Sequence, residues 1–298
     1  MLTALTLVVL VLAVAAAAWG PGTHLEFEAR VFRRRRERLP ADVAGLIESE
    51  RRAYQYGNIA ADIVNLKAIG GHYNHCHRWT IVEEMRAHAE TDAERAFILG
   101  YLSHLAADTI AHNHFVPYHL ARFARTQGLG HLYWEMNADR YVPEERWEVV
   151  TRLKNDAELG DMDRLVWATV PKRALSKGTN KVIFNHVLLV SEREQWRRGV
   201  ARLHPLAKLD LTRGFLDLFR DAAVERILLA LRPGGIEKLA HIDTNGKDAQ
   251  KRAVSTRRWL VRLTAGPRRD HEAEERAKTF LEGMQSPPPL AVDAQPHW

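Results

Sequence analysis

Hydrophobic residues recur along most of the chain at the spacing of amphipathic helices, whereas the alternating pattern of strands is nearly absent. The pattern predicts one helix over about residues 25–38, which stops at Leu39-Pro40. A second predicted helix covers about residues 41–56 and ends near Gly57. We therefore expect an all-α fold.

The next part of the chain alternates between loop and helix. Residues 57–80 read as a loop because Gly70-Gly71 interrupts any regular pattern. A long amphipathic helix is expected from Val82 to about Phe115, ending there because Pro117 follows. Residues 131–141 and most of 144–231 are again helical in pattern, with breaks near glycines and at residues 233–235.

The N-terminus has the layout of a signal peptide. Residues 1–18 carry no charged side chain, and Leu7 to Ala18 is continuously apolar. The run ends in Ala16-Ala17-Ala18, a small-x-small cleavage pattern, and is shorter than the roughly 20 residues of a spanning helix. We predict cleavage before Trp19 and a secreted or periplasmic protein that can associate with membranes.

Beyond the signal peptide, residues 19–265 are expected to form one all-helical domain. Its chemical motifs lie within 19–141, and the remainder, 142–265, is recognisable only as helical. Residues 266–298 combine charge runs with three consecutive prolines, a composition typical of a disordered tail.

Composition and charge add little. The 298 residues are 46% hydrophobic, enough for a well-buried core. The formal net charge of +6 suits anionic surfaces, but arginine clusters such as 33–36 are usually solvated helix faces. Cys76 is the single cysteine, so no intrachain disulfide can form, and we expect it to be a small buried residue rather than a ligand.

Histidine placement gives the clearest chemical prediction. Nine of the fifteen histidines fall between His72 and His131. His104 and Asp108 are four residues apart, which places both side chains on one helix face, and His131 and Glu135 repeat this spacing. Imidazole nitrogens and carboxylate oxygens are both zinc ligands, so the two pairs predict a metal site.

Two further histidines lie between these pairs. On an ideal helix His112 lies about 40° round from Asp108, and His114 lies about 120° away. His112 is therefore the better candidate ligand, with His114 as the alternative. Upstream, Asp62 precedes His75 and His77, of which we expect one to bind metal.

Together these residues resemble the zinc-dependent phospholipase C superfamily, which includes bacterial phospholipases C, single-strand-specific fungal nucleases and phospholipase D-type domains. The resemblance implies an all-helical domain holding three zinc ions, with Asp62 bridging ions and orienting or deprotonating the attacking water. It also implies that the amino group and carbonyl of Trp19, freed by cleavage, are ligands. The implied metal ligands are Trp19, His24, Asp62, His75 or His77, His104, Asp108, His112 (or His114), His131 and Glu135.

One segment departs from the bacterial and fungal pattern, in which a proline precedes a histidine six residues after the aspartate. No proline lies between Asp108 and His112 here, and the order of residues 103–112 looks more like the phospholipase D-type branch. His114 does occupy the six-residue spacing, so the choice between His112 and His114 stays open at this point.

The resemblance implies hydrolysis of a phospholipid headgroup ester, of C or D type, with a phospholipid or membrane surface as partner and no obligate protein partner. One alternative is a single-strand nuclease, in which Trp79, Tyr133 and Trp134 could stack nucleic-acid bases. The other is a non-catalytic lipid-binding module. The basic amphipathic segment 213–226 could lie on a membrane or simply pack against the other helices.

Overall fold

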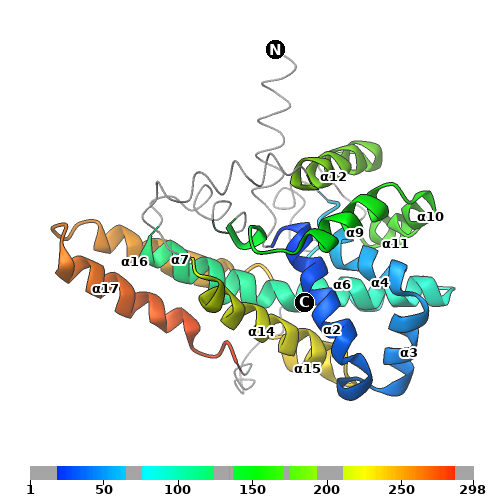
Figure 1. Cartoon of the computed structure of the whole chain (residues 1–298), viewed down its shortest axis with the longest axis horizontal. Coiled ribbons are helices and arrows are strands. Elements are labelled where there is room, and N and C mark those ends of the chain that lie inside the picture. The colour runs from blue at the N-terminus through cyan, green and yellow to red at the C-terminus, as the bar shows by residue number, and fades with distance from the viewer. Residues whose placement is uncertain are drawn as a thin grey trace, which may run out of the picture.

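The computed structural model describes residues 19–64, 76–123, 134, 137–170, 175–192 and 211–285, with side chains described to residue 185 in the fifth range. These residues form helices joined by turns, with no strand among them (Figure 1). The all-α expectation is therefore confirmed.

The helices fall into three consecutive groups. The first is α2 (Pro21–Arg38), α3 (Ala41–Ser49), α4 (Arg51–Ala60), α5 (Thr80–Arg86), α6 (Asp92–Ile110), the π-helix η2 (Ala111–Phe115) and α7 (Val116–Arg122). The second is α9 (Glu144–Lys154), α10 (Ala157–Gly160), α11 (Asp163–Thr169) and α12 (Lys177–Glu192). The third is α14 (Arg213–Ala230), α15 (Gly235–Leu239), α16 (Lys247–Leu260), α17 (Pro267–Lys278) and the 3₁₀ turn η4 (Thr279–Leu281).

Helix α6 is the central element, buried on nearly all sides and packed against α4, α14 and α2. It begins at a capping box. The Thr91 hydroxyl accepts the backbone N–H of Glu94 at 3.2 Å, and the Glu94 carboxylate accepts that of Thr91 at 3.1 Å. This cap explains why the predicted helix over 82–115 is divided, since α5 ends at Arg86 and α6 begins anew after Thr91.

Helices α4 and α6 approach closely because each has a glycine at the crossing. A Cβ atom on Gly57 would lie 2.0 Å from the Phe97 carbonyl oxygen, and one on Gly100 would lie 2.1 Å from that of Tyr54. The close contact holds the backbone of Asn58, at the end of α4, beside α6.

We expect Gly100→Ala to lower the free energy of unfolding by about 2–3 kcal/mol, because the added methyl group forces two helix backbones apart. Urea denaturation measures the change. Gly45→Ala is the matched control, since a Cβ atom there meets nothing within 4 Å and alanine favours the helix. Equal stability of the two variants would show that the crossing is loose.

The chain does not leave the helix before Pro117, contrary to the expectation from its sequence. Residues 111–115 form a π-helix, in which the Val116 N–H bonds the Ala111 carbonyl five residues back. Pro117 occupies the first turn of α7, where its missing N–H is tolerated. The helical direction therefore continues to Arg122.

The predicted disordered tail is wrong for residues 267–281, which form α17 and η4. Ala273 and Ala277 are buried, and the Arg226 guanidinium donates to the carbonyls of Gly283 and Met284 at 3.4 Å. The inward face of α17 consists of small alanines. In the sequence, the charged residues between these alanines obscure the amphipathic pattern of the helix. Residues 286–298 lie outside the described part, as does the predicted signal peptide, 1–18.

Helix α14 packs against the other helices with its apolar stripe. Leu216 and Phe219 are buried, and α14 contacts α6 and α2. Arg220 and Arg226 are also buried, donating to the Ala138 carbonyl and the Thr109 hydroxyl at 3.1 and 3.2 Å. The packing interpretation of residues 213–226 is thus confirmed. No helix of the described residues is both long enough and apolar enough to span a bilayer.

Candidate metal centre

Six of the predicted ligands converge beside α6. His104 and Asp108 come from α6 itself, and the other four come from α2, the end of α4, the turn before α5, and η2. The six are His24, Asp62, His77, His104, Asp108 and His112. All are buried except Asp62, whose side chain is 20% exposed.

The Asp108 carboxylate lies at the centre of this group. Its Oδ2 atom is 3.0 Å from the Nε2 of His77 and 3.2 Å from that of His104. His112 Nε2 is 3.9 Å from the same oxygen, and His24 Nε2 is 3.5 Å from Oδ1. Four imidazoles therefore face one fully buried carboxylate.

Asp62 approaches from the side that is open to solvent. Its Oδ1 atom lies 3.4 Å from His77 Nε2 and 3.9 Å from His104 Nε2. The two histidine Nε2 atoms are 3.0 Å apart, and the rings of His24 and His104 stack at 3.9 Å. His104 therefore lies close to each of Asp62, His77 and His24.

Two sets of three donors are close enough to hold one ion each. In each set the ligand atoms lie within 4.8 Å of one another: His24, Asp62 and His104 form one set, and His77, His104 and Asp108 the other. Nitrogen and oxygen donors gathered at this spacing around buried carboxylates fit zinc. Whether these residues bind metal remains a prediction, but the donor set fits the ion.

Backbone and side-chain contacts orient the imidazoles. The Nδ1 atom of His104 lies 2.8 Å from the Asn58 carbonyl, so Nδ1–H donates there and Nε2 is left to face the carboxylates. His77 Nδ1 lies 3.2 Å from the Cys76 sulfur, and Thr244 donates its hydroxyl to the His77 carbonyl. Cys76 is buried beside the centre, as expected of a small residue.

The negative charge of the centre acts on the pKa of His104. Burial opposes protonation of this imidazole, but the carboxylates of Asp108 and Asp62 outweigh burial and raise the pKa of His104. Such a site attracts a cation, and a bound zinc ion would provide the positive charge in place of the proton.

Of the two histidines left open by the sequence, His112 is the one that faces Asp108. Its Nδ1 atom lies 3.1 Å from Gln250 Nε2. His114 points elsewhere and donates from Nδ1 to the Phe280 carbonyl at 2.8 Å. Burial lowers the pKa of His114 to about 4, consistent with a neutral structural residue.

The remaining predicted ligands are placed less fully. Trp19 is buried, and its indole N–H donates to the Ala107 carbonyl at 3.4 Å, one residue before Asp108. The proposed role of its amino group and carbonyl stays a prediction. Of the pair His75 and His77, His77 reaches the centre, whereas His75, His131 and Glu135 lie outside the described residues.

A family model described as zinc dependent phospholipase C matches residues 23–180. The chain belongs to the zinc-dependent phospholipase C family. Neither a search of curated proteins nor one of solved structures returned a match. Four of the six histidines and aspartates at the centre lie on helices of the matched range. The other two, Asp62 and His77, lie within it in the turn after α4 and the turn before α5.

Some residues around the candidate metal centre were not predicted. Asn58 contributes only a backbone carbonyl, and Gln250 and Thr244 come from beyond residue 180, outside the family match. A lone glutamine or threonine in a helical sequence carries no chemical pattern. Only the fold could have revealed them.

The two tryptophans considered as base-stacking surfaces are core residues in this phospholipase family member. Trp79 is buried and donates its indole N–H to the Ile242 carbonyl at 2.9 Å. Trp134 is buried against His119, with ring centroids 4.1 Å apart. Tyr133 lies outside the described residues.

The acid stability of the protein should depend on His119. Burial lowers the pKa of His119 to about 3, whereas an unfolded histidine titrates near 6.5. Between these values the unfolded chain binds the extra proton, so stability falls as pH falls. We expect His119→Phe to remove about 3 kcal/mol of the loss between pH 6.5 and 4, leaving a smaller slope from His114.

Urea unfolding at several pH values, with excess chelator in both proteins, measures this difference. Above pH 7 the two profiles should run parallel, because His119 is neutral in both states there. Identical slopes between pH 4 and 6.5 would mean that His119 is protonated in the folded protein.

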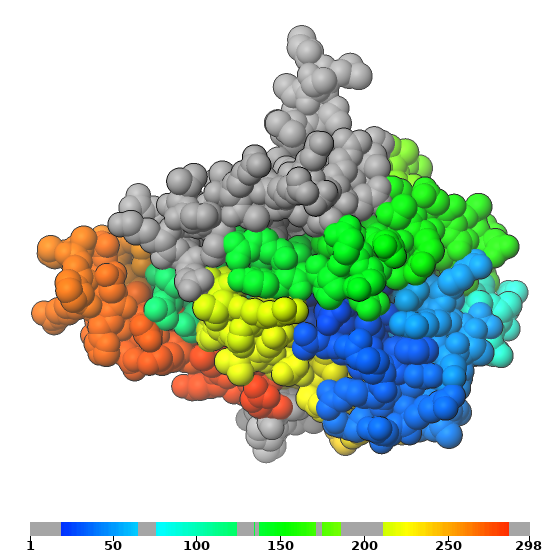
Figure 2. All heavy atoms as spheres, viewed as in Figure 1, coloured from blue at the N-terminus to red at the C-terminus, as the bar shows by residue number. Residues whose placement is uncertain are grey.

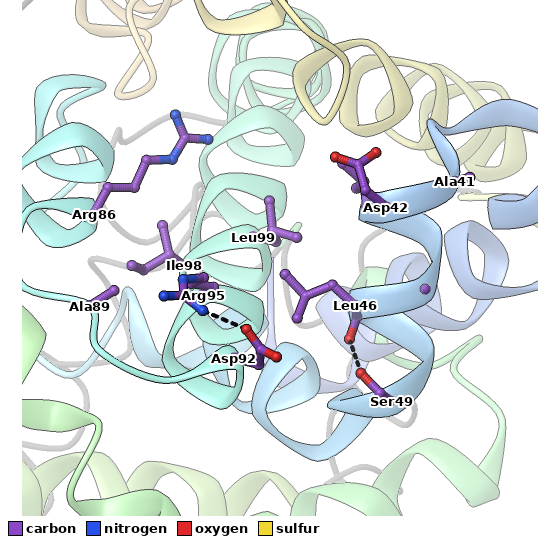
Figure 3. A pocket seen from close by; sticks show the side chains of 12 residues that line it. Ala41, Asp42, Leu46, Ser49, Arg86, Ala89, Asp92, Arg95, Ile98 and Leu99 are labelled. Carbon is purple, nitrogen blue, oxygen red and sulfur yellow. Dashed lines mark hydrogen bonds and ion pairs between the residues drawn. The ribbon is translucent and has the colours of Figure 1, made fainter.

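A groove of about 640 Å³ lies on the opposite side of α6 from the centre. Leu46 of α3 and Leu99 of α6 lie on its two sides, and Arg95 bonds Asp92 at its rim at 2.5 Å (Figure 3). Leu99 and Asp108 are nine residues apart, about half a turn round the helix. No histidine is among the described residues that line the groove, so we do not assign the candidate metal centre to it.

Proposed function

We propose that this protein is a zinc-dependent phosphodiesterase that hydrolyses the headgroup ester of a phospholipid, with C- or D-type cleavage. The observation that carries the proposal is the convergence of four imidazoles on the buried Asp108 carboxylate, with Asp62 at the open side. Membership of the zinc-dependent phospholipase C family supports the same chemistry.

Zinc bound there would lower the pKa of a coordinated water and neutralise the negative charge of the phosphate. The chain's residues would divide the remaining work. His24, His77, His104, His112 and Asp108 would hold the ions, and Asn58 would keep His104 aimed inward. Asp62, partly exposed, is placed to accept a proton from the attacking water.

The proposal includes three ions per chain and the predicted processing. Cleavage before Trp19 would free its amino group as a ligand, and the mature protein would act outside the cytoplasm on a phospholipid surface. The buried Trp19 indole, bonded next to Asp108, supports a start of the mature chain near the centre.

The test combines metal content, N-terminal sequence and products. We expect secreted protein beginning at Trp19 to contain about three zinc ions and to hydrolyse phosphatidylcholine or phosphatidylethanolamine vesicles. Release of diacylglycerol identifies C-type cleavage, and phosphatidate identifies D-type cleavage. Zinc-dependent cleavage of single-stranded DNA without lipid hydrolysis would select the nuclease, and zinc without any turnover would select the binding module.

A further inference from the structure

The turn between α16 and α17 carries a concentration of positive charge. Residues 249–269 include seven basic residues and no acidic residue. They form most of α16, the turn after it and the start of α17, which together make up one end of the molecule (Figures 1 and 2). The seven are Lys251, Arg252, Arg257, Arg258, Arg262, Arg268 and Arg269.

Most of this charge is not compensated within the protein. Within the described ranges, four exposed arginines of residues 249–269 make no ion pair with a carboxylate: Arg252 and Arg258 of α16, Arg262 of the turn and Arg268 of α17. The arginine cluster of α2 differs, because Arg34 and Arg38 pair with Glu225 and Arg36 pairs with Glu48. The turn therefore presents its positive charge to solvent.

Apolar side chains are exposed among these arginines. Trp259 is 40% exposed and Val261 is 45% exposed, two of the four large hydrophobic residues exposed in the described part of the chain. The Arg276 guanidinium lies over the Trp259 ring, 4.0 Å from its centroid. Tryptophan and arginine combine an apolar body with a polar end, the composition of side chains at the bilayer headgroup layer.

Helix α16 connects this surface to the metal centre. Near its start, Gln250 contacts His112, and Trp259 follows nine residues later. Nine residues of α-helix span about 14 Å. The basic turn and the centre therefore lie at the two ends of one helix.

We propose that the exposed residues of the α16–α17 turn dock on the surface of an anionic phospholipid bilayer. The uncompensated arginines bind lipid phosphates, while Trp259 and Val261 enter the interface. A bilayer fits better than nucleic acid because exposed apolar and basic side chains lie together over residues 258–262 at the end of α16. Docking itself does not depend on the proposed function. Only the role of the bound surface, which is to present the substrate, rests on it.

Vesicle sedimentation with the zinc-loaded, full-length mature protein tests the proposal. We expect binding to vesicles containing phosphatidylglycerol, little binding to pure phosphatidylcholine, and weaker binding as salt rises. The double variant Arg258→Glu/Arg262→Glu should bind about 30-fold more weakly, since each basic residue near the surface contributes about fivefold. Trp259→Ala should weaken binding several-fold at any salt concentration.

The matched control is Arg33→Glu/Lys238→Glu, which changes the net charge equally at exposed positions of α2 and α15. It should bind like the wild type. Equal binding by both double variants, or binding to single-stranded DNA but not to vesicles, overturns the proposal.

A soluble short-chain phospholipid, used below its micelle concentration, separates docking from catalysis. The Arg258→Glu/Arg262→Glu variant should hydrolyse it at the wild-type rate and lose activity only on anionic vesicles. Vesicle binding by a wild type that hydrolyses no phospholipid leaves the docking surface standing and rejects the proposed function. Hydrolysis of the soluble substrate by the wild type, together with unchanged vesicle binding by the variant, supports the proposed function and rejects the docking surface.

Discussion

Asp108→Asn is expected to abolish hydrolysis, lowering activity by at least about 10³-fold, and to release most of the bound zinc. Both oxygens of Asp108 face imidazoles, with His77 and His104 within 3.2 Å of Oδ2 and His24 3.5 Å from Oδ1. An amide offers one weak oxygen donor and no charge, so it cannot replace a carboxylate that joins these groups. Elemental analysis and phospholipid turnover on the same sample measure both effects.

Asp163→Asn provides the matched control for Asp108. Asp163 is also a buried aspartate, but it bonds the Tyr56 hydroxyl at 2.5 Å and Lys181 at 2.8 Å, away from the centre. Its substitution should reduce stability and keep the zinc content. A zinc-replete, active Asp108→Asn protein would mean that Asp108 is a structural carboxylate.

Asp62→Asn should lower kcat by about 10²–10⁴-fold while the protein loses no more than one zinc ion per chain. The set of His77, His104 and Asp108 does not include Asp62, so that set should still hold its ion. Asp62 is partly exposed, whereas Asp108 is fully buried, so Asp62 is the carboxylate that an attacking water can reach. Steady-state kinetics on a soluble phosphodiester separate this effect from lipid binding.

The pH profile distinguishes a proton-accepting Asp62 from a ligand alone. Over the pH range in which elemental analysis shows that both proteins keep their zinc, the wild type should lose kcat as pH falls, and Asp62→Asn should show no such limb. Asp42→Asn, an exposed aspartate of α3, should leave rate and profile unchanged. If Asp62→Asn keeps the acid limb at a uniformly lower rate, Asp62 acts by holding metal.

Much of the centre could be predicted from the sequence because the spacing of its ligands along a helix shows which side chains share a face. His104 and Asp108 share a helix face by their separation alone, and the structure places them 3.2 Å apart. The preference for His112 over His114 came from the same geometry. The preference for His112 holds despite the π-helix, because His112 is only the second residue of η2.

What escaped prediction depends on contacts between distant parts of the chain. Gln250 reaches His112 across 138 residues, and the Asn58 carbonyl is a backbone atom that every residue possesses. Helix α17 escaped for a different reason. Its inward face consists of alanines, and in the sequence the charged residues between them resemble a solvated segment. Only the structure shows that α7 and α16 pack against α17.

The π-helix at Ala111–Phe115 has a consequence for how this chain can vary. One extra residue in a helical turn rotates everything downstream by about 100° relative to an uninterrupted helix. The side chains before the π-helix that face the candidate metal centre and those after it, such as His119, thus lie on helix faces offset by this rotation. Substitutions within the turn preserve that offset, whereas deleting a single residue would swing the inner face of α7 toward water. Length is the more strictly constrained property of this segment.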